Sequence, residues 1–208
     1  MTRPSNPEII EKIILLTIND IHENGTKNLS MRNLAKKARI TPTTIYYYFK
    51  NKEDLIDQVK LYAISDLDTY LYQNIDKSKS YSFQLKFVIQ SFIDWNIKNH
   101  NLSKILFEKL PGKQNINSKS SREYYKPLFK IISISRNGHR INEFNVPNPS
   151  LLATAGFSWL YGLVKLHTQN TFIHEYRNKL DELTELTTNL ILNQITISNF
   201  TEKYDLKK

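Results

Sequence analysis

The chain contains no cysteine among its 208 residues. Disulfides, thiolate metal sites and cysteine nucleophiles are therefore excluded. Glycine is scarce, with 5 residues, and valine is rare, whereas leucine, isoleucine, lysine, glutamate and asparagine are frequent. This composition favours helix over sheet, so we expect an all-α fold.

Long apolar runs are also missing. No segment approaches the roughly 20 apolar residues that a membrane helix needs. Glu11 and Lys12 interrupt the N-terminal stretch where a signal peptide would have its apolar core. We therefore expect a cytoplasmic protein that makes no membrane contact. Hydrophobic residues still make up 40% of the chain, which is enough to fill a core.

Signatures of catalysis are absent as well. The five histidines do not have the spacing of metal ligands. The sequence has no phosphate-binding glycine loop, no paired-carboxylate site and no serine-triad signature. We therefore expect no catalytic residue, no metal and no cofactor, and we predict that the protein is not an enzyme.

The formal charge of +9 is distributed unevenly. Between residues 26 and 52 the chain has basic residues and no acidic one. The stretch from Lys109 to Arg140 has eight basic residues against Glu123 alone. This second stretch could attract an anionic ligand or could simply be a solvated outer face, and the sequence leaves both open.

Apolar residues recur at helical spacing along most of the chain, which predicts about nine helices. The polar stretch 76–82 separates them into two groups. We expect one domain at residues 6–66 and a second at 80–200. In the first, Asn6-Pro7, Ser30 and Thr41-Pro42 each predict a helix start, and Gly25 predicts a helix end.

Residues 30–49, SMRNLAKKARITPTTIYYYF, predict two short helices joined by a tight turn. The second helix is rich in hydroxyl groups, has lysines and arginines around it and contains no carboxylate. A short polar helix of this kind, following a turn, is what a DNA major groove can accept. Ile45 and Phe49, at positions i and i+4, should point inward, and the three consecutive tyrosines cannot all share one face of a helix.

These residues resemble the tetracycline-repressor (TetR) family of transcriptional regulators. The resemblance covers roughly residues 9–67 and is carried by the Gly25 turn and by two segments, SMRNLA at 30–35 and TIYYYFKNKEDL at 44–55. It implies a three-helix helix-turn-helix domain, followed by a C-terminal helical domain for ligand binding and dimerisation. The chain departs from the family at Arg39, where glycine is usual in the turn, and at Pro42-Thr43.

The resemblance also implies roles for individual residues. Thr41, Pro42, Thr43 and Tyr47 would face base edges. Thr44, Tyr46, Tyr48 and Lys52 would contact phosphates, and Ser30 is a further phosphate candidate. The expected partner is a double-stranded, (pseudo)palindromic DNA operator, because a homodimer doubles the short site that one helix reads.

The family dimerises through its last two helices. The matching residues here are small ones on one helix, Ala155 and Gly156, and a near-heptad stripe on the last, Leu183, Leu186, Leu190 and Ile197. These side chains could instead face the protein's own core.

The central helices would then enclose a small-molecule effector. The candidate lining residues are aromatic: Phe92, Trp95, Phe107, Tyr124, Tyr125, Trp159 and Tyr161. Aromatic residues at helical spacing are also what an ordinary core contains. The leading hypothesis is a homodimeric repressor that an effector releases from its operator. The alternative is a DNA-binding interaction or architectural protein of the same fold, controlled by a protein partner, with no small-molecule ligand.

Overall fold

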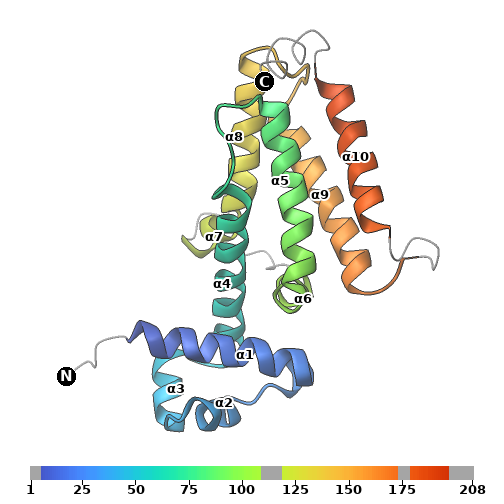
Figure 1. Ribbon diagram of the computed structural model, residues 1–208. Helices are drawn as coiled ribbons and strands as arrows, with labels where there is room; N and C mark the ends of the chain where they lie inside the picture. The colour runs from blue at the N-terminus through green and yellow to red at the C-terminus, as the bar shows by residue number, and fades with distance from the viewer. Residues whose placement is uncertain (1–5, 109–118, 173–178, 197–208) are drawn as a thin grey trace. The chain divides into compact units, whose positions relative to one another are not determined.

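The computed structural model describes residues 6–108, 119–172 and 179–196, and in this part of the chain it contains ten α-helices and no β-strand. A single isolated bridge joins Phe144 and Thr196. The all-α prediction is confirmed (Figure 1). Within the described ranges, no helix is long and apolar enough to span a bilayer.

The described residues form two compact units. The first contains residues 6–65 together with residues 101–108, and the second contains residues 66–100, 119–172 and 179–196. The predicted domains, 6–66 and 80–200, differ from this division at the short helix α6 (His100–Glu108), most of which belongs to the first unit. Helix α4 (Lys52–Tyr72) begins in the first unit and ends in the second.

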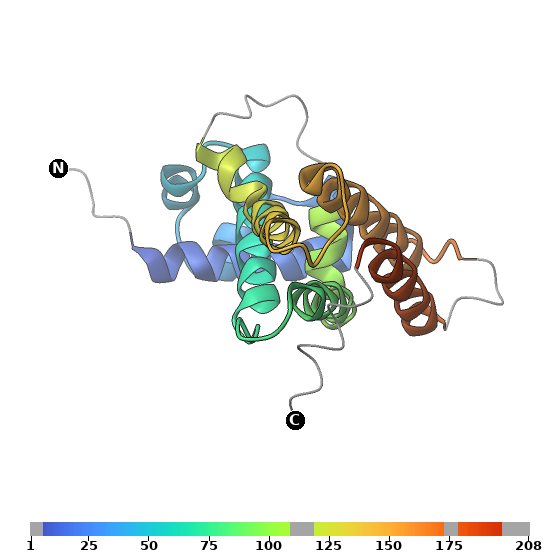
Figure 2. The same cartoon turned by 90° about the horizontal axis from the view of Figure 1, so that it is seen from above.

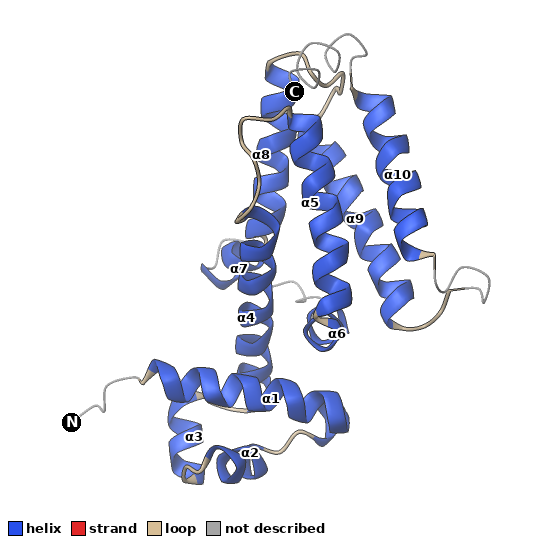
Figure 3. Cartoon of the chain, in the orientation of Figure 1, coloured by secondary structure: helices blue, strands red, loops and turns tan. Residues whose placement is uncertain are grey.

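The first unit begins with α1 (Pro7–Asn28), α2 (Met31–Ala38) and α3 (Pro42–Tyr48). Side chains cap all three helices as the sequence predicts: Asn6 accepts from the Glu8 amide, Ser30 from the Asn33 amide and Thr41 from the Thr44 amide. Gly25, at φ 76° and ψ 161°, interrupts the regular geometry of α1. Figure 3 shows the short turn between α2 and α3, with α1 lying beside them.

A continuous apolar core holds the first unit together. Its fully buried side chains include Ile13, Leu34, Ile45, Phe49 and Leu55. Ile45 and Phe49 therefore point inward, as predicted. Ile105 of α6 belongs to the same core, and Leu102 packs against it. Helix α6 is thus part of this unit's packing, a contact for which the sequence gives no signal.

The second unit is a helical bundle of α5 (Tyr81–Lys98), α8 (Lys126–Arg140), α9 (Pro149–Thr168) and α10 (Leu180–Ile195), with the short α7 (Lys119–Tyr124) and the last turns of α4. Helix α8 packs against α5 and α9, and α10 packs against α5 and α9 (Figure 2). Pro127 lies in the first turn of α8, where its missing N–H leaves no hydrogen bond unmade. The helix ends at Arg140.

A buried carboxylate fixes the start of α5. Glu143, with no exposed surface, accepts hydrogen bonds from the amides of Tyr81 and Ser82 at 2.8 and 2.6 Å and from the Ser82 hydroxyl at 2.5 Å. It therefore satisfies amides that a helix N-terminus leaves unpaired, and its charge suits that end of the helix dipole. The neighbouring Phe144 ring lies where a Cβ on Gly138 would be, so only glycine fits there.

Candidate nucleic-acid interface

The start of α3 is organised by two threonines. The Thr41 hydroxyl accepts from the Thr44 amide at 3.1 Å and lies 2.8 Å from the Thr44 hydroxyl. Thr41, Pro42 and Thr43 are exposed, and Thr44 is half-buried. The hydroxyls of Thr41 and Thr44 are therefore already engaged with each other. Because a hydroxyl has one donor and two acceptor sites, both retain capacity for an external partner.

The three tyrosines of α3 divide between surface and core. Tyr46 and Tyr47 are 53% and 52% exposed. Tyr48 is partly buried and packs against the first unit's core, with its ring edge-to-face with that of Tyr47, 5.1 Å between centroids. Tyr48 thus orients Tyr47 as well as closing the core. This division follows from the 100° between successive residues of a helix, with Ile45 fixing the buried side.

The remaining predicted contact residues lie at helix starts. Ser30 caps α2, and Lys52 is the first residue of α4. The Lys52 ammonium donates to the Lys27 carbonyl at 2.9 Å, which ties the start of α4 to the end of α1. An ammonium has three donors, so two remain for a phosphate.

A polar hollow of about 700 Å³ lies on the same unit, and the sequence analysis did not anticipate it. Its lining consists of amide, ammonium and carboxylate side chains: Asp20, Asn24, Asn28, Asn33, Lys36 and Lys37. The Lys37 ammonium bonds to the buried Asp20 carboxylate at 2.6 Å, and this hydrogen bond raises the pKa of Lys37. The spacing of Asn24 and Asn28, four residues apart on α1, was the signal available in the sequence.

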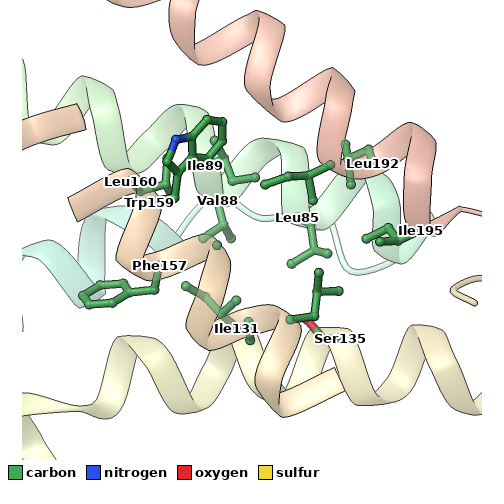
Figure 4. Close-up of a pocket in the computed structure, with 14 residues that line it drawn as sticks. Leu85, Val88, Ile89, Ile131, Ser135, Phe157, Trp159, Leu160, Leu192 and Ile195 are labelled. Carbon is green, nitrogen blue, oxygen red and sulfur yellow. The ribbon is translucent and has the colours of Figure 1, made fainter. Parts of the chain in front are cut away.

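The second unit contains a small apolar cavity of about 40 Å³ between α5, α8, α9 and α10. Figure 4 shows the side chains around it, which are aliphatic and aromatic apart from Ser135. Of the seven predicted lining residues, Trp159 lines this cavity.

The other six predicted lining residues are placed elsewhere. Trp95 is buried, and its indole donates to Asp66 at 2.7 Å. Phe92 packs edge-to-face on Phe157, and Phe107 lies in the first unit. Tyr124 and Tyr125 pack on each other, burial raises the pKa of Tyr124, and Tyr161 is half-buried. Aliphatic residues of α5, α8 and α10 supply most of the lining instead, and nothing distinguishes them from ordinary core residues in the sequence.

A wider polar groove of about 710 Å³ lies elsewhere on the second unit, between the end of α4, the start of α5 and α8. Asp68, which is buried, accepts from the Lys130 ammonium at 2.6 Å, and the Lys126 ammonium lies 3.7 Å away. The other Asp68 oxygen, Oδ1, has no hydrogen-bond partner among the described residues. Burial, together with the Asp68 charge, raises the pKa of Tyr72 in this groove.

The basic stretch from Lys109 to Arg140 is partly engaged within the chain. Lys126 and Lys130 lie against Asp68, Arg136 donates to Ser150 and Arg140 donates to Asn137. Lys109 and Lys113 lie outside the described residues. The cations of α8 therefore serve local contacts as well as facing solvent.

The outer face of α9 and α10 carries exposed apolar side chains among polar ones. Leu186 and Leu190 of α10 are 58% and 56% exposed, and Leu183 is half-buried. On α9, Leu151 and Ala155 are exposed and Gly156 is half-buried, with nothing within 4 Å of where its Cβ would lie. Ile197, the last predicted interface residue, lies outside the described residues. Leu180, Thr184 and Thr188 form the opposite, buried stripe of α10.

Residues 13–59, which contain most of α1, all of α2 and α3 and the start of α4, match the family model "Bacterial regulatory proteins, tetR family". This match covers 47 of the 208 residues and confirms, for that segment, the resemblance to the TetR family. The family that this segment matches consists of transcriptional regulators, which are not enzymes.

Two curated proteins match part of the chain. An uncharacterized HTH-type transcriptional regulator of Haemophilus influenzae is 32% identical over 84 residues, which are 40% of this chain and 45% of that protein. The fatty acid metabolism regulator protein of Bacillus subtilis is 28% identical over 101 residues, which are 49% of this chain and 50% of that protein. The chain thus spans about half the length of the curated relatives it matches.

A solved structure shares the TetR-family fold over most of the chain. It is the transcriptional regulator FadR from Bacillus subtilis, in complex with stearoyl-CoA, with a TM-score of 0.73 and 22% identity. The superposition covers 89% of this chain and 98% of that one. At this identity the likeness shows a common fold.

Proposed function

We propose that this TetR-family chain is a sequence-specific DNA-binding transcriptional regulator that acts as a homodimeric repressor. The observation that carries this function is α3 itself. It is a short helix with an apolar inner side, Ile45, and an outer side of exposed hydroxyl and aromatic groups, inside a stretch of 27 residues, 26–52, that has no carboxylate. Such a surface complements the hydrogen-bonding edges and phosphates of a DNA major groove.

The proposed assignment of base contacts and phosphate contacts follows the exposure of the side chains. Thr41, Pro42, Thr43 and Tyr47 read base edges, with the Tyr47 ring available to thymine methyl groups. Ser30, Thr44, Tyr46, Tyr48 and Lys52 contact phosphates. Since Tyr48 is partly buried, this contact is limited to the exposed part of its side chain.

Tyr47→Ala and Tyr46→Ala form a matched pair, because the two rings are almost equally exposed. Tyr47→Ala should relax discrimination between an operator and its base-substituted versions by about 1–3 kcal/mol. Tyr46→Ala should instead weaken binding to all duplexes about equally. Affinities measured by fluorescence anisotropy on both kinds of duplex check this. Equal loss of discrimination in the two variants, or none in either, would show that α3 does not read bases in this way.

The proposed dimer places α9 and α10 of one copy against the same helices of the other. The support is the outer face of these helices, where leucines are more than half exposed beside small residues that allow close approach. Exposed apolar side chains that gather on one face are typical of association sites. A two-fold axis would present two copies of α3 to a (pseudo)palindromic operator.

The proposed effector carries a long apolar chain that enters the cavity between α5, α8, α9 and α10. Two observations support this chemistry: the apolar lining, and the fold shared with a regulator solved with stearoyl-CoA. The cavity of about 40 Å³ is far smaller than the roughly 300–1,000 Å³ of ligand sites. The effector must therefore bind a conformation in which this cavity is wider. Its preference for that conformation would supply the free energy that releases the protein from its operator.

The same small volume supports a second candidate function. Because the core of the second unit is nearly filled, the protein could bind DNA with the same fold and be controlled by a protein partner, without a small-molecule ligand.

Three probes separate these functions: stearoyl-CoA, stearate and coenzyme A without an acyl chain. For an acyl effector, stearoyl-CoA or stearate at micromolar concentration should lower operator affinity by about 5–150-fold, whereas coenzyme A alone should not. Ala153→Leu, which adds volume to the cavity lining, should retain operator binding and lose this response. Gel shifts with each probe provide the measurement. No response to either acylated probe would favour the ligand-free function.

A further inference from the structure

The turn between α2 and α3 contains an arginine in a conformation that side chains rarely adopt. Arg39 has φ 61° and ψ 42°, in the left-handed region. A Cβ atom is unfavourable there, and glycine or asparagine is the usual occupant. Among the described residues, the other positions with positive φ are Gly25, Asn142 and Asn170. Among the described residues with positive φ, Arg39 is therefore the one that is neither glycine nor asparagine.

The turn itself needs only the backbone of this residue. The Arg39 amide donates to the carbonyls of Ala35 and Lys36, and the Ile40 amide donates to the Ala35 carbonyl at 3.0 Å. These bonds close the C-terminus of α2. Glycine would make the same bonds with less strain, so the formation of the turn does not explain the arginine side chain.

Packing and ion pairing do not explain it either. The Arg39 side chain is exposed, and no hydrogen bond or ion pair joins its guanidinium to another described residue. No carboxylate lies within residues 26–52 of the sequence. An exposed guanidinium at a strained position near other cations lowers stability, and none of the described residues compensates for this cost.

The position of Arg39 indicates a partner outside the chain. It lies two residues before Thr41, the N-cap of α3, so the two Cα atoms are at most about 7 Å apart. The long Arg39 side chain can therefore reach the start of the helix that is proposed to enter the major groove. Its planar set of N–H groups matches a phosphate in a two-point contact.

We infer that Arg39 is a DNA-contacting residue, which clamps a backbone phosphate next to the base pairs read by the start of α3. This role rests on the proposed DNA-binding function and adds to it a contact that comes from the turn. The phosphate contact would compensate for the strain of the left-handed turn only when DNA is bound. Arg39 therefore favours DNA binding and lowers the stability of the free protein.

Substitutions at Arg39 separate this role from a structural one. Arg39→Asn removes the charge but tolerates the left-handed conformation, and Arg39→Gly removes both charge and strain. Lys104→Asn, at an exposed cation of α6 in the same unit, is the control for loss of one positive charge. Each protein is titrated with a selected operator and with a base-substituted operator at several salt concentrations, and its melting temperature is measured.

We expect Arg39→Asn and Arg39→Gly to bind both duplexes about tenfold more weakly, with a salt-dependence slope reduced by about 1. Both should melt at or above the temperature of the unsubstituted protein. Lys104→Asn should leave affinity and slope close to those of the unsubstituted protein.

Three results would overturn the Arg39 role: unchanged affinity and slope, a changed base preference at constant slope, or a lower melting temperature in both variants. If the unsubstituted protein shows no sequence-specific binding, the proposed function fails as well. Specific binding that is indifferent to Arg39 overturns only the role of this residue.

Discussion

Leu190→Asp should convert the protein from dimers into monomers and lower its operator affinity on the order of 100-fold or more. The Leu190 side chain is 56% exposed in the single chain, next to the equally exposed Leu186. In the proposed dimer it would be buried against the partner copy, where an unpaired carboxylate is strongly unfavourable. Loss of the dimer removes the second half-site contact and with it the gain from linking two binding events. Sedimentation velocity and anisotropy titrations measure the two effects.

Asn189→Asp is the matched control for this substitution. Asn189 is exposed and adjacent in sequence, but it lies about 100° around α10, on the side of Glu182 and Glu185. The Asn189→Asp substitution introduces the same charge with little change in side-chain shape, so dimer mass and operator affinity should be retained. An unchanged mass for Leu190→Asp, or equal loss in both variants, would reject the placement of the interface on this face of α10.

Glu143→Ala should lower the free energy of unfolding by about 3 kcal/mol. The substitution leaves the partly buried Tyr81 amide, the buried Ser82 amide and the Ser82 hydroxyl without the Glu143 carboxylate as acceptor. For a chain of this size the loss corresponds to a decrease in melting temperature of roughly 6–12 °C. Thermal unfolding followed by circular dichroism at 222 nm measures it.

Glu182→Ala provides the comparison, because Glu182 is exposed and its one ion pair among the described residues is with Lys179, at 3.3 Å. Surface pairs of this kind contribute about 0–1 kcal/mol. Comparable melting temperatures for the two alanine variants would mean that Glu143 does not hold the start of α5.

Features encoded by local sequence were the most predictable from the chain alone. The caps at Asn6, Ser30 and Thr41 form as expected, because each depends on one side chain and amides two or three residues away. The burial of Ile45 and Phe49 follows from helical spacing in the same way. The family resemblance, also carried by short-range motifs, is confirmed by the family match.

Features that depend on distant packing were less predictable. Helix α6 joins the first unit because Leu102 and Ile105 meet its core, a contact between residues far apart in sequence. The cap that Glu143 gives to α5 joins residues 61 and 62 positions apart. The cavity lining could not be predicted either, because Leu85, Val88 and Ile131 have the same spacing as any core residue, whereas the aromatic residues fill space in the core.

At two positions near α3, Arg39 and Lys52, the structure adds information that the sequence does not contain. Arg39 could be recognised as unusual from the sequence, but its left-handed conformation and exposed, unpaired guanidinium required the structure. Lys52 was expected to contact phosphate, and the structure adds that its ammonium also donates to the Lys27 carbonyl. Part of its effect on binding would therefore come through the contact between α1 and α4.

Selection of binding sites from a random duplex library, followed by footprinting of the unsubstituted protein at about 150 mM salt, tests the central claim most directly. We expect one two-fold symmetric site, with two protected half-sites separated by about one helical turn of 34–36 Å or a multiple of it. Protection should persist as salt is raised, because base contacts add to phosphate contacts. Binding that shows no preferred sequence and disappears with salt would contradict the assignment of α3 as a reading helix.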